Sequence, residues 1–238
     1  MADRDDPPNR PGSPGVVAGV SETDRVKAFS DGVFAIVITL LVLELRVPEH
    51  EPGGLLHGLL QEWPAYLAFV VSFVYVGVIW LNHHALLRLV AGMTLALNWI
   101  NLAVLLGAVI VPFSTSVLAA ALAPGSDDRD RRVAVVLYAV AAALMSAPWM
   151  VLFGYLRRRP ELLSPGVTRR YIRSQAFRPL TGLLLYGLSG LLGWFVNPVV
   201  GLVGIIVMIC YHALTSEGLR EGPLGRLLGR GSAGRPAS

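Results

Sequence analysis

Six long apolar stretches dominate this sequence and decide what the chain can fold into. They cover approximately residues 26–45, 64–87, 93–122, 133–156, 176–196 and 198–216. A helix that crosses a bilayer needs about 20 mostly apolar residues, and each stretch is close to that length. Only 15% of the residues are charged, whereas soluble domains carry about 25%. The sequence therefore predicts an all-α membrane protein with six transmembrane helices.

Prolines and polar ends divide the chain further. The Asn197-Pro198 pair predicts a tight turn between the last two stretches, and Pro112 predicts a kink or tilt in the third. We expect residues 1–22 and the basic tail 217–238 to be disordered, which leaves residues 23–216 as one six-helix domain. A single cysteine, Cys210, excludes an internal disulfide framework.

The basic residues predict an orientation in the membrane. With an even number of spans both chain ends lie on one side, and 16 of the 20 Lys and Arg residues fall on that side. The four on the other side are Arg46, Arg129, Arg131 and Arg132. The positive-inside rule therefore places both termini in the cytoplasm. Membrane topology also explains the net charge of +4, so we expect no nucleic-acid partner.

Several polar side chains interrupt the first three spans at a similar depth. A carboxylate such as Asp31 costs about 2.5 to 3.5 kcal/mol at the centre of a spanning helix. At 1.5 Å per residue, Asp31, His83, Asn98 and Asn101 all lie about 7 to 14 Å in from the cytoplasmic ends of their spans. Such groups need partners. We expect a network that joins the three spans, in which Asp31 is neutralised by Arg25 or by a histidine.

The same residues permit two functional interpretations. Asp31 with His83 or His84 could relay protons, as intramembrane carboxylates do in pumps. The adjacent histidines could instead bind a metal, but neighbouring residues point about 100° apart on a helix, and no convincing further ligands accompany them. We favour a structural brace and predict no metal site and no cofactor.

The outer half of the first span carries an apolar stripe. Ile36, Leu40 and Leu43 follow i, i+4, i+7 spacing, and Thr39 lies about 60° to one side of Ile36. Asp31 points about 140° away from Ile36 on the same helical wheel. The stripe either packs on neighbouring helices or faces a pore, and the spacing alone permits both.

The first span also resembles that of a known family. The segment RVKAFSDGVFAIVITLLVLEL is similar to the first helix of the transmembrane protein 175 family of potassium channels, especially its bacterial members. The hallmark is an Arg followed closely by Phe-Ser-Asp, here Arg25 and Phe29-Ser30-Asp31. The segments WLNHHALL and NLAVLLGAVIVPFSTSVL look like the family's second and third spans. The resemblance extends over about residues 23 to 215, one six-helix unit.

The resemblance implies a homotetramer in which four first helices line a central pore. By position, Ile36, Leu40 and Leu43 match the apolar residues that narrow this pore, and Thr39 matches a threonine implicated in potassium preference. The interhelical polar network then comprises Arg25, Phe29, Ser30, Asp31, Trp80, His83, His84, Asn98 and Asn101. The chain lacks a TVGYG-like selectivity filter, so apolar constrictions and threonine hydroxyls would have to discriminate between ions.

The sequence thus predicts a potassium-permeable leak channel, multi-pass in the plasma membrane, with moderate preference for K⁺ over Na⁺. The alternative is a proton-coupled secondary transporter that uses Asp31 and His83 or His84. No clear internal repeat or pair of broken helices supports that alternative. An enzyme is not expected, because the HExxH and GxSxG motifs are both absent.

Overall fold

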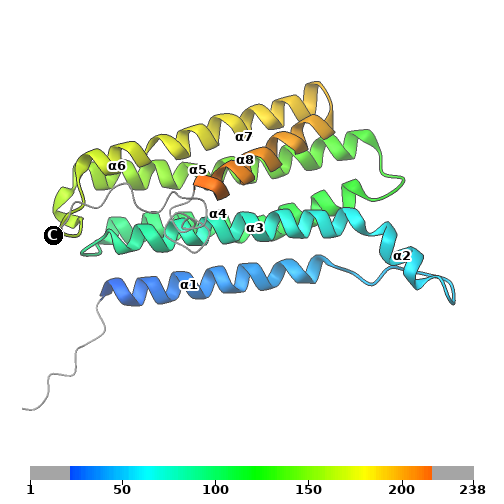
Figure 1. The fold of residues 1–238 in the computed structure, drawn as a ribbon, viewed down its shortest axis with the longest axis horizontal. Helices are drawn as coiled ribbons and strands as arrows, with labels where there is room; N and C mark the ends of the chain where they lie inside the picture. The colour runs from blue at the N-terminus through cyan, green and yellow to red at the C-terminus, as the bar shows by residue number, and fades with distance from the viewer. Residues whose placement is uncertain (1–21, 216–238) are drawn as a thin grey trace, which may run out of the picture.

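The computed structural model describes residues 22–215, whose long helices lie side by side in one bundle (Figure 1). The two terminal segments predicted to be disordered lie outside the described residues, except Glu22, which begins the first helix. The elements in chain order are α1 (Glu22–Leu41), η1 (Val42–Glu44), α2 (Leu55–Gln61), α3 (Trp63–Arg88), α4 (Leu95–Leu122), α5 (Asp128–Arg158), η2 (Pro160–Leu162), α6 (Arg169–Gln175), α7 (Phe177–Phe195) and α8 (Pro198–Thr215).

Long helices occupy all six predicted positions, and five of them are long and apolar enough to cross a membrane. These are α1 with η1, α3, α4, α5 and α8. The sixth, α7, has 19 residues, but Arg178, Pro179, Thr181 and several glycines dilute its apolar content. The sixth span therefore stays a prediction. Pro112 lies inside α4, which continues on both sides of it.

Local capping explains where the helices begin. Side-chain oxygens of Thr94, Asp127 and Asn197 accept backbone N–H groups at the starts of α4, α5 and α8, at 3.2, 2.8 and 2.8 Å. These caps satisfy donors that have no partner within the helix. Pro198 is the first residue of α8, where its missing N–H costs nothing. The break between α7 and α8 thus falls where the Asn197-Pro198 pair predicts.

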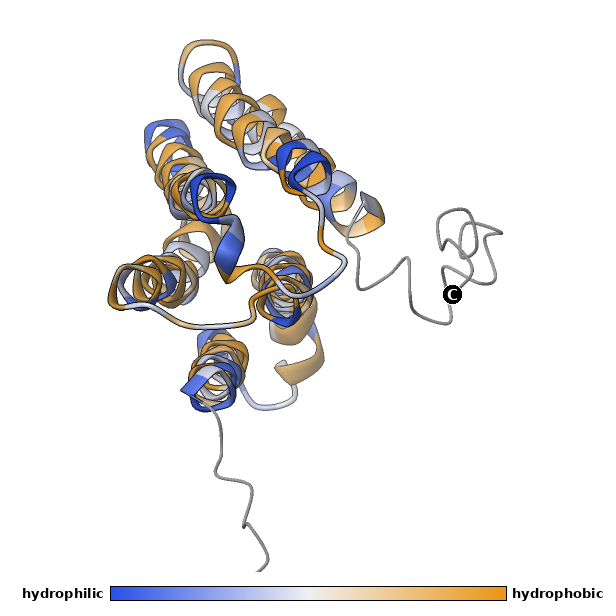
Figure 2. Ribbon diagram, turned by 90° about the vertical axis from the view of Figure 1, so that its left-hand side faces the viewer, coloured by the Kyte–Doolittle hydropathy of each residue, from blue (hydrophilic) through white to orange (hydrophobic). Residues whose placement is uncertain are grey.

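The helices are arranged so that α1 forms one edge of the bundle. It packs against α3 and α4, while α7 and α8 lie at the opposite edge against α5 (Figure 1). The start of α1 and the short helix α6 lie at the same end of the bundle. Viewed toward this end, the helices are mostly hydrophobic along their length and hydrophilic near their tips (Figure 2). This distribution is the one that a bilayer requires of a helical bundle.

Close backbone approach joins α7 to α8. A Cβ atom at Gly201 would lie 2.6 Å from the Cα atom of Gly193 and 2.7 Å from the carbonyl oxygen of Ser189. Both neighbours belong to the backbone of α7, which cannot rotate away as a side chain can. The two helices therefore pack at a separation that only glycine at position 201 permits.

We expect Gly201→Ala to destabilise the protein by about 1 to 3 kcal/mol, the usual cost of overpacking. Thermal unfolding of the purified protein in detergent measures the loss. Gly187→Ala is the matched control, because a Cβ at this α7 position meets nothing within 4 Å. Its melting temperature should stay the same or rise, since alanine is the better helix former. Equal losses in the two variants would contradict the proposed close contact.

Candidate functional site

Helix α1 has two different faces. Ser30, Phe34, Val37 and Leu41 are each at most 1% exposed and follow helical spacing along one side. This side contacts α3 and α4. The opposite side carries Ile36 and Leu40, and the apolar stripe continues with Leu43 in η1. One face of α1 is thus anchored to its own subunit and the other is not.

A chain of hydrogen bonds anchors the buried face. The Nδ2 atom of Asn101 on α4 donates to the hydroxyl of Ser30 on α1 at 3.1 Å. The Oδ1 atom of the same amide lies 2.7 Å from Nε2 of His83 on α3. All three side chains are buried. One amide therefore holds α1, α3 and α4 together, and we call these three residues the amide brace.

The amide brace also determines which imidazole nitrogen of His83 carries the proton. Because Nδ2 of Asn101 donates to Ser30, Oδ1 is the acceptor, and Nε2 of His83 must be the donor. The Nδ1 atom of His83 is buried and has no hydrogen-bond partner in the described part of the chain. The ring is enclosed by Phe34 and Trp149, with ring centroids at 5.3 and 6.2 Å. This apolar enclosure suits a neutral imidazole.

A second polar contact lies beside the first. Oδ1 of Asp31 accepts from the indole N–H of Trp80 at 2.7 Å, and its Oδ2 lies 3.7 Å from Nδ1 of His84. The side chains of Asp31 and His84 remain 39% and 35% exposed. The Trp80 bond compensates part of the hydration that the carboxylate loses inside a spanning helix. We call Asp31, Trp80 and His84 the carboxylate clasp.

Three residues of the expected network lie outside both groups. Of the two partners considered for Asp31, the structure provides the histidine, and within residues 22–215 no ion pair joins Arg25 to Asp31. Arg25 and Phe29 are exposed in the first turns of α1. The Oδ1 atom of Asn98 is buried, and no described residue forms a hydrogen bond with it. These three side chains line one pocket together with Asn101 of the amide brace, so they lie next to the brace. Equal depth in the membrane thus brings them close without ensuring a hydrogen bond.

The apolar stripe is exposed in the single subunit. Ile36, Leu40 and Leu43 are 60%, 40% and 70% exposed, so none of them is enclosed by the other helices of its own chain. The Thr39 hydroxyl is also on this side and donates to the carbonyl oxygen of Ile36 at 2.8 Å. With its hydrogen used in this way, the Thr39 oxygen can offer a lone pair outward, as a cation requires.

The two histidines have separate surroundings. His83 joins the amide brace and His84 the carboxylate clasp. In the described part of the chain, no three His, Cys, Asp or Glu side chains gather in a way that could hold a metal ion. The geometry therefore gives each of these histidines its own polar neighbours and does not direct both toward one metal ion.

One polar cluster was missed by the sequence reasoning. The Ser72 hydroxyl lies 2.9 Å from that of Tyr138 and accepts from Thr115 at 2.7 Å, which joins α3, α4 and α5. All three residues are buried. A polar residue inside each of three apolar spans was the available signal. Their depths alone did not show that they face one another.

Comparison with known proteins places these features in a family. The family model described as endosomal/lysosomal potassium channel TMEM175 matches residues 25–112, the region that holds the amide brace, the carboxylate clasp and the apolar stripe. A protein of Streptomyces collinus named as a potassium channel is 41% identical over 171 residues, which are 71% of this chain and 82% of that protein. This chain belongs to the TMEM175 family. It is related to channels, not to a family of enzymes.

Further TMEM175 relatives extend the match along the chain. A potassium channel of Chamaesiphon minutus is 37% identical over 205 residues, which cover 83% of this chain and 96% of that protein. The crystal structure described as a lysosomal potassium-selective channel TMEM175 homolog from Chamaesiphon minutus superposes with a TM-score of 0.72 at 35% identity. It covers 82% of this chain and 98% of the crystallised chain. The fold is therefore shared over almost the whole of that relative.

We expect Asn101→Ala to destabilise this TMEM175 protein by about 1 to 3 kcal/mol, because it leaves Ser30 and His83 buried without their common partner. Thermal unfolding of the purified protein measures the effect. Asn98→Ala, three residues earlier on α4, is the control, since the Oδ1 atom it removes has no hydrogen-bond partner among residues 22–215. A loss in the control as large as in Asn101→Ala would argue against a special role for the amide brace.

Proposed function

We propose that this protein is a potassium-permeable leak channel built from four identical subunits, with α1 of each subunit lining a central pore. The protein is then multi-pass in the plasma membrane, with six spans and both termini in the cytoplasm. Two relatives that match most of the chain are named as potassium channels. The physical support comes from α1 and is independent of those names.

The observation that carries the proposal is the division of α1 into two faces. The buried face is attached by a hydrogen bond to Asn101 on α4 and one to Trp80 on α3. From Gly32 to Leu43, the exposed positions carry only glycine, aliphatic side chains and Thr39. One helix has too little surface to enclose a passage by itself. Four copies around an axis would bring four such faces together.

Permeation then depends on the apolar stripe. Rings formed by Ile36, Leu40 and Leu43 would hold water poorly, so an ion that passes them sheds part of its hydration without gaining a charged ligand. The penalty is larger for the more strongly hydrated Na⁺, which gives a moderate preference for K⁺. The Thr39 oxygen, placed between these rings, would supply a neutral ligand. A narrow, dry passage also implies a low open probability.

The alternative, a proton-coupled transporter, finds less support in the same geometry. Its proposed coupling groups, Asp31 with His83 or His84, hold partners within one subunit. The Nε2 proton of His83 is committed to Asn101, and the indole of Trp80 occupies one oxygen of Asp31. These contacts favour a role in fixing α1 over a role in carrying protons across the membrane.

The proposed pore predicts a gain of conductance in Ile36→Asn. Four amides would wet the narrow ring, so current should rise severalfold and the preference for K⁺ over Na⁺ should fall. Planar-bilayer recordings with K⁺ and Na⁺ on opposite sides, normalised to the amount of assembled protein, give both quantities.

Leu184→Asn on α7 is the matched control for this variant. Leu184 is 62% exposed and belongs to the edge of the bundle away from α1, so its amide should leave conductance and reversal potential unchanged. A well-assembled Ile36→Asn channel that behaves like this control would show that the apolar stripe does not line the ion path.

The proposal also predicts the subunit number. Native mass spectrometry of the detergent-purified protein should give an assembly of four chains, each of 25.6 kDa. In a Cys210→Ser background, Ile36→Cys should form disulfide-linked dimers on mild oxidation, because four copies meet near an axis. Val203→Cys on α8, 52% exposed in the single subunit, should not. A two-chain mass, or equal cross-linking at both positions, would contradict the architecture.

A further inference from the structure

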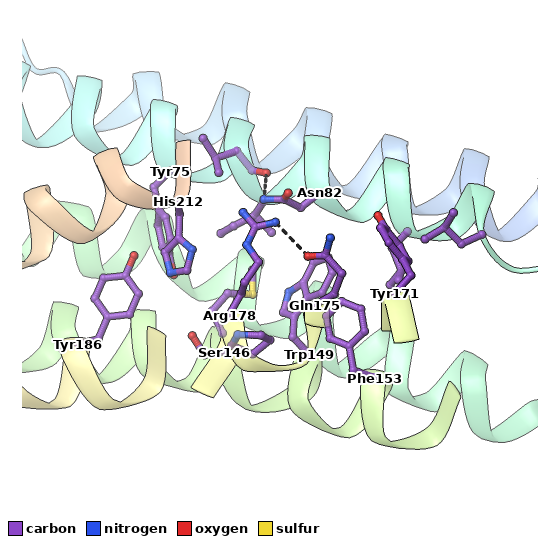
Figure 3. A pocket seen from close by; sticks show the side chains of 16 residues that line it. Tyr75, Asn82, Ser146, Trp149, Phe153, Tyr171, Gln175, Arg178, Tyr186 and His212 are labelled. Atoms are coloured by element: carbon purple, nitrogen blue, oxygen red, sulfur yellow. Dashed lines mark hydrogen bonds between the residues drawn. The ribbon is translucent and has the colours of Figure 1, made fainter. Parts of the chain in front are cut away.

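The short helix α6 and the start of α7 follow one another along one edge of the bundle, away from α1 (Figure 1). Only Ala176 separates the two helices, and its φ and ψ of −65° and −19° are helical. The inward side of this path carries Tyr171, Gln175 and Arg178, which follow i, i+4, i+7 spacing and line a cavity inside the subunit (Figure 3). The inward side therefore belongs to the subunit interior, and the outward side is left for other contacts.

Three arginines occupy the outward side of α6. Arg169, Arg170 and Arg173 are all exposed, and they lie about 100 to 160° from Tyr171 on the helical wheel. Among residues 22–215, none of these three guanidinium groups has an ion-pair or hydrogen-bond partner. Ile172, on another side of the same helix, is 0% exposed and holds α6 against the bundle. The three cationic groups are thus free to bind an anion from a helix that is fixed in place.

The positive charge of this region is not balanced locally. From Arg157 to Arg178 the sequence has seven arginines and one acidic residue, Glu161. The Oε1 atom of Glu161 is already 3.4 Å from Nη1 of Arg159. Helix α6 packs against α5, and Arg157 and Arg158 at the end of α5 are exposed as well. Clusters of this size directly beside a spanning helix are typical of surfaces that bind anionic lipids.

The side chains that follow on α7 indicate which anion fits. Phe177 and Leu180 are 61% and 37% exposed. Together with Arg170 and Arg173 they are spaced by three, four and three residues, so the four side chains share one helical face. The predicted span of about 176–196 begins between Arg173 and Phe177, which places the guanidinium groups beside lipid headgroups and the apolar side chains beside acyl chains. A phospholipid has the same order of charged and apolar parts, whereas a soluble anion has no part for the apolar side chains.

We propose that this face binds an anionic phospholipid, with its phosphate on Arg170 and Arg173 and its acyl chains along Phe177 and Leu180. A planar guanidinium can donate two parallel hydrogen bonds to one phosphate. Arg169 adds positive charge beside the headgroup. A zwitterionic lipid carries its own ammonium group, so it gains less from this surface than a lipid with net negative charge. The proposal concerns lipid binding, uses the predicted sixth span and does not depend on the pore.

The test is native mass spectrometry of the full-length protein in detergent, titrated with one phospholipid at a time. Phosphatidylglycerol should bind at least about tenfold more tightly than phosphatidylcholine with the same acyl chains. Glycerol 3-phosphate, which has the charge without the chains, should not displace phosphatidylglycerol. Arg170→Gln combined with Arg173→Gln should weaken the affinity for phosphatidylglycerol by at least about tenfold and leave that for phosphatidylcholine unchanged. Phe177→Ala should weaken the binding of both lipids, because the acyl chains lose a contact.

Matched controls remove the same groups at the other end of the bundle. Arg129→Gln combined with Arg131→Gln removes two arginines from the start of α5, where three aspartates accompany them, and Phe195→Ala removes a 76% exposed ring from the end of α7. Both controls should bind phosphatidylglycerol as the wild type does. Melting curves without added lipid confirm that each variant is folded, and Arg173→Gln alone replaces the double variant if that one does not fold. Equal affinity for the two lipids, displacement by glycerol 3-phosphate, or a loss in the folded α6 variant no larger than in its control would each overturn the proposal.

Discussion

The side-chain amide of Asn101 is the contact on which the arrangement of the first three long helices depends. It uses both of its ends, donating to Ser30 on α1 and accepting from His83 on α3. In an apolar interior such a group is costly when any partner is missing and specific when all are present. A rotation of α1 about its own axis would break the bond to Ser30, so the amide determines which face of α1 is turned inward.

This orientation explains how an otherwise ordinary apolar helix can have two roles. Apolar packing alone distinguishes poorly between the faces of α1, since both are rich in Val, Ile and Leu. The hydrogen bonds to Ser30 and Asp31 break that equivalence. They leave Ile36, Leu40 and Leu43 on the outside, where lipid or another subunit must cover them. The polar groups near one end of the helix thus determine that the aliphatic groups near the other end face away from their own subunit.

The ring of Trp149 connects the two regions of the subunit. Its centroid is 6.2 Å from that of His83 in the amide brace, and it also lines the cavity beside Arg178. The cavity and the anchor of α1 therefore share a wall. The segment after α3 is also joined to the segment after α5, since the backbone N–H of Ala91 donates to the carbonyl oxygen of Leu162 at 2.9 Å.

By itself the sequence determined the helical class, the positions of the six long helices and the turn at Asn197-Pro198, because hydrophobic length, caps and prolines are local properties. The depth of these residues and the family resemblance also predicted one interhelical polar network that includes Ser30, Asp31, Trp80, His83, His84 and Asn101. Only the tertiary structure decided that this group divides in two. Within residues 22–215 it places His84, not Arg25, beside Asp31, and it gives the Oδ1 atom of Asn98 no hydrogen-bond partner. The physical reason is that depth along a helix follows from counting residues, whereas the direction of a side chain follows from how each helix is rotated against its neighbours. The same rotation creates the cluster of Ser72, Thr115 and Tyr138 and the cavity beside Arg178. A local sequence pattern does not predict how the helices are rotated.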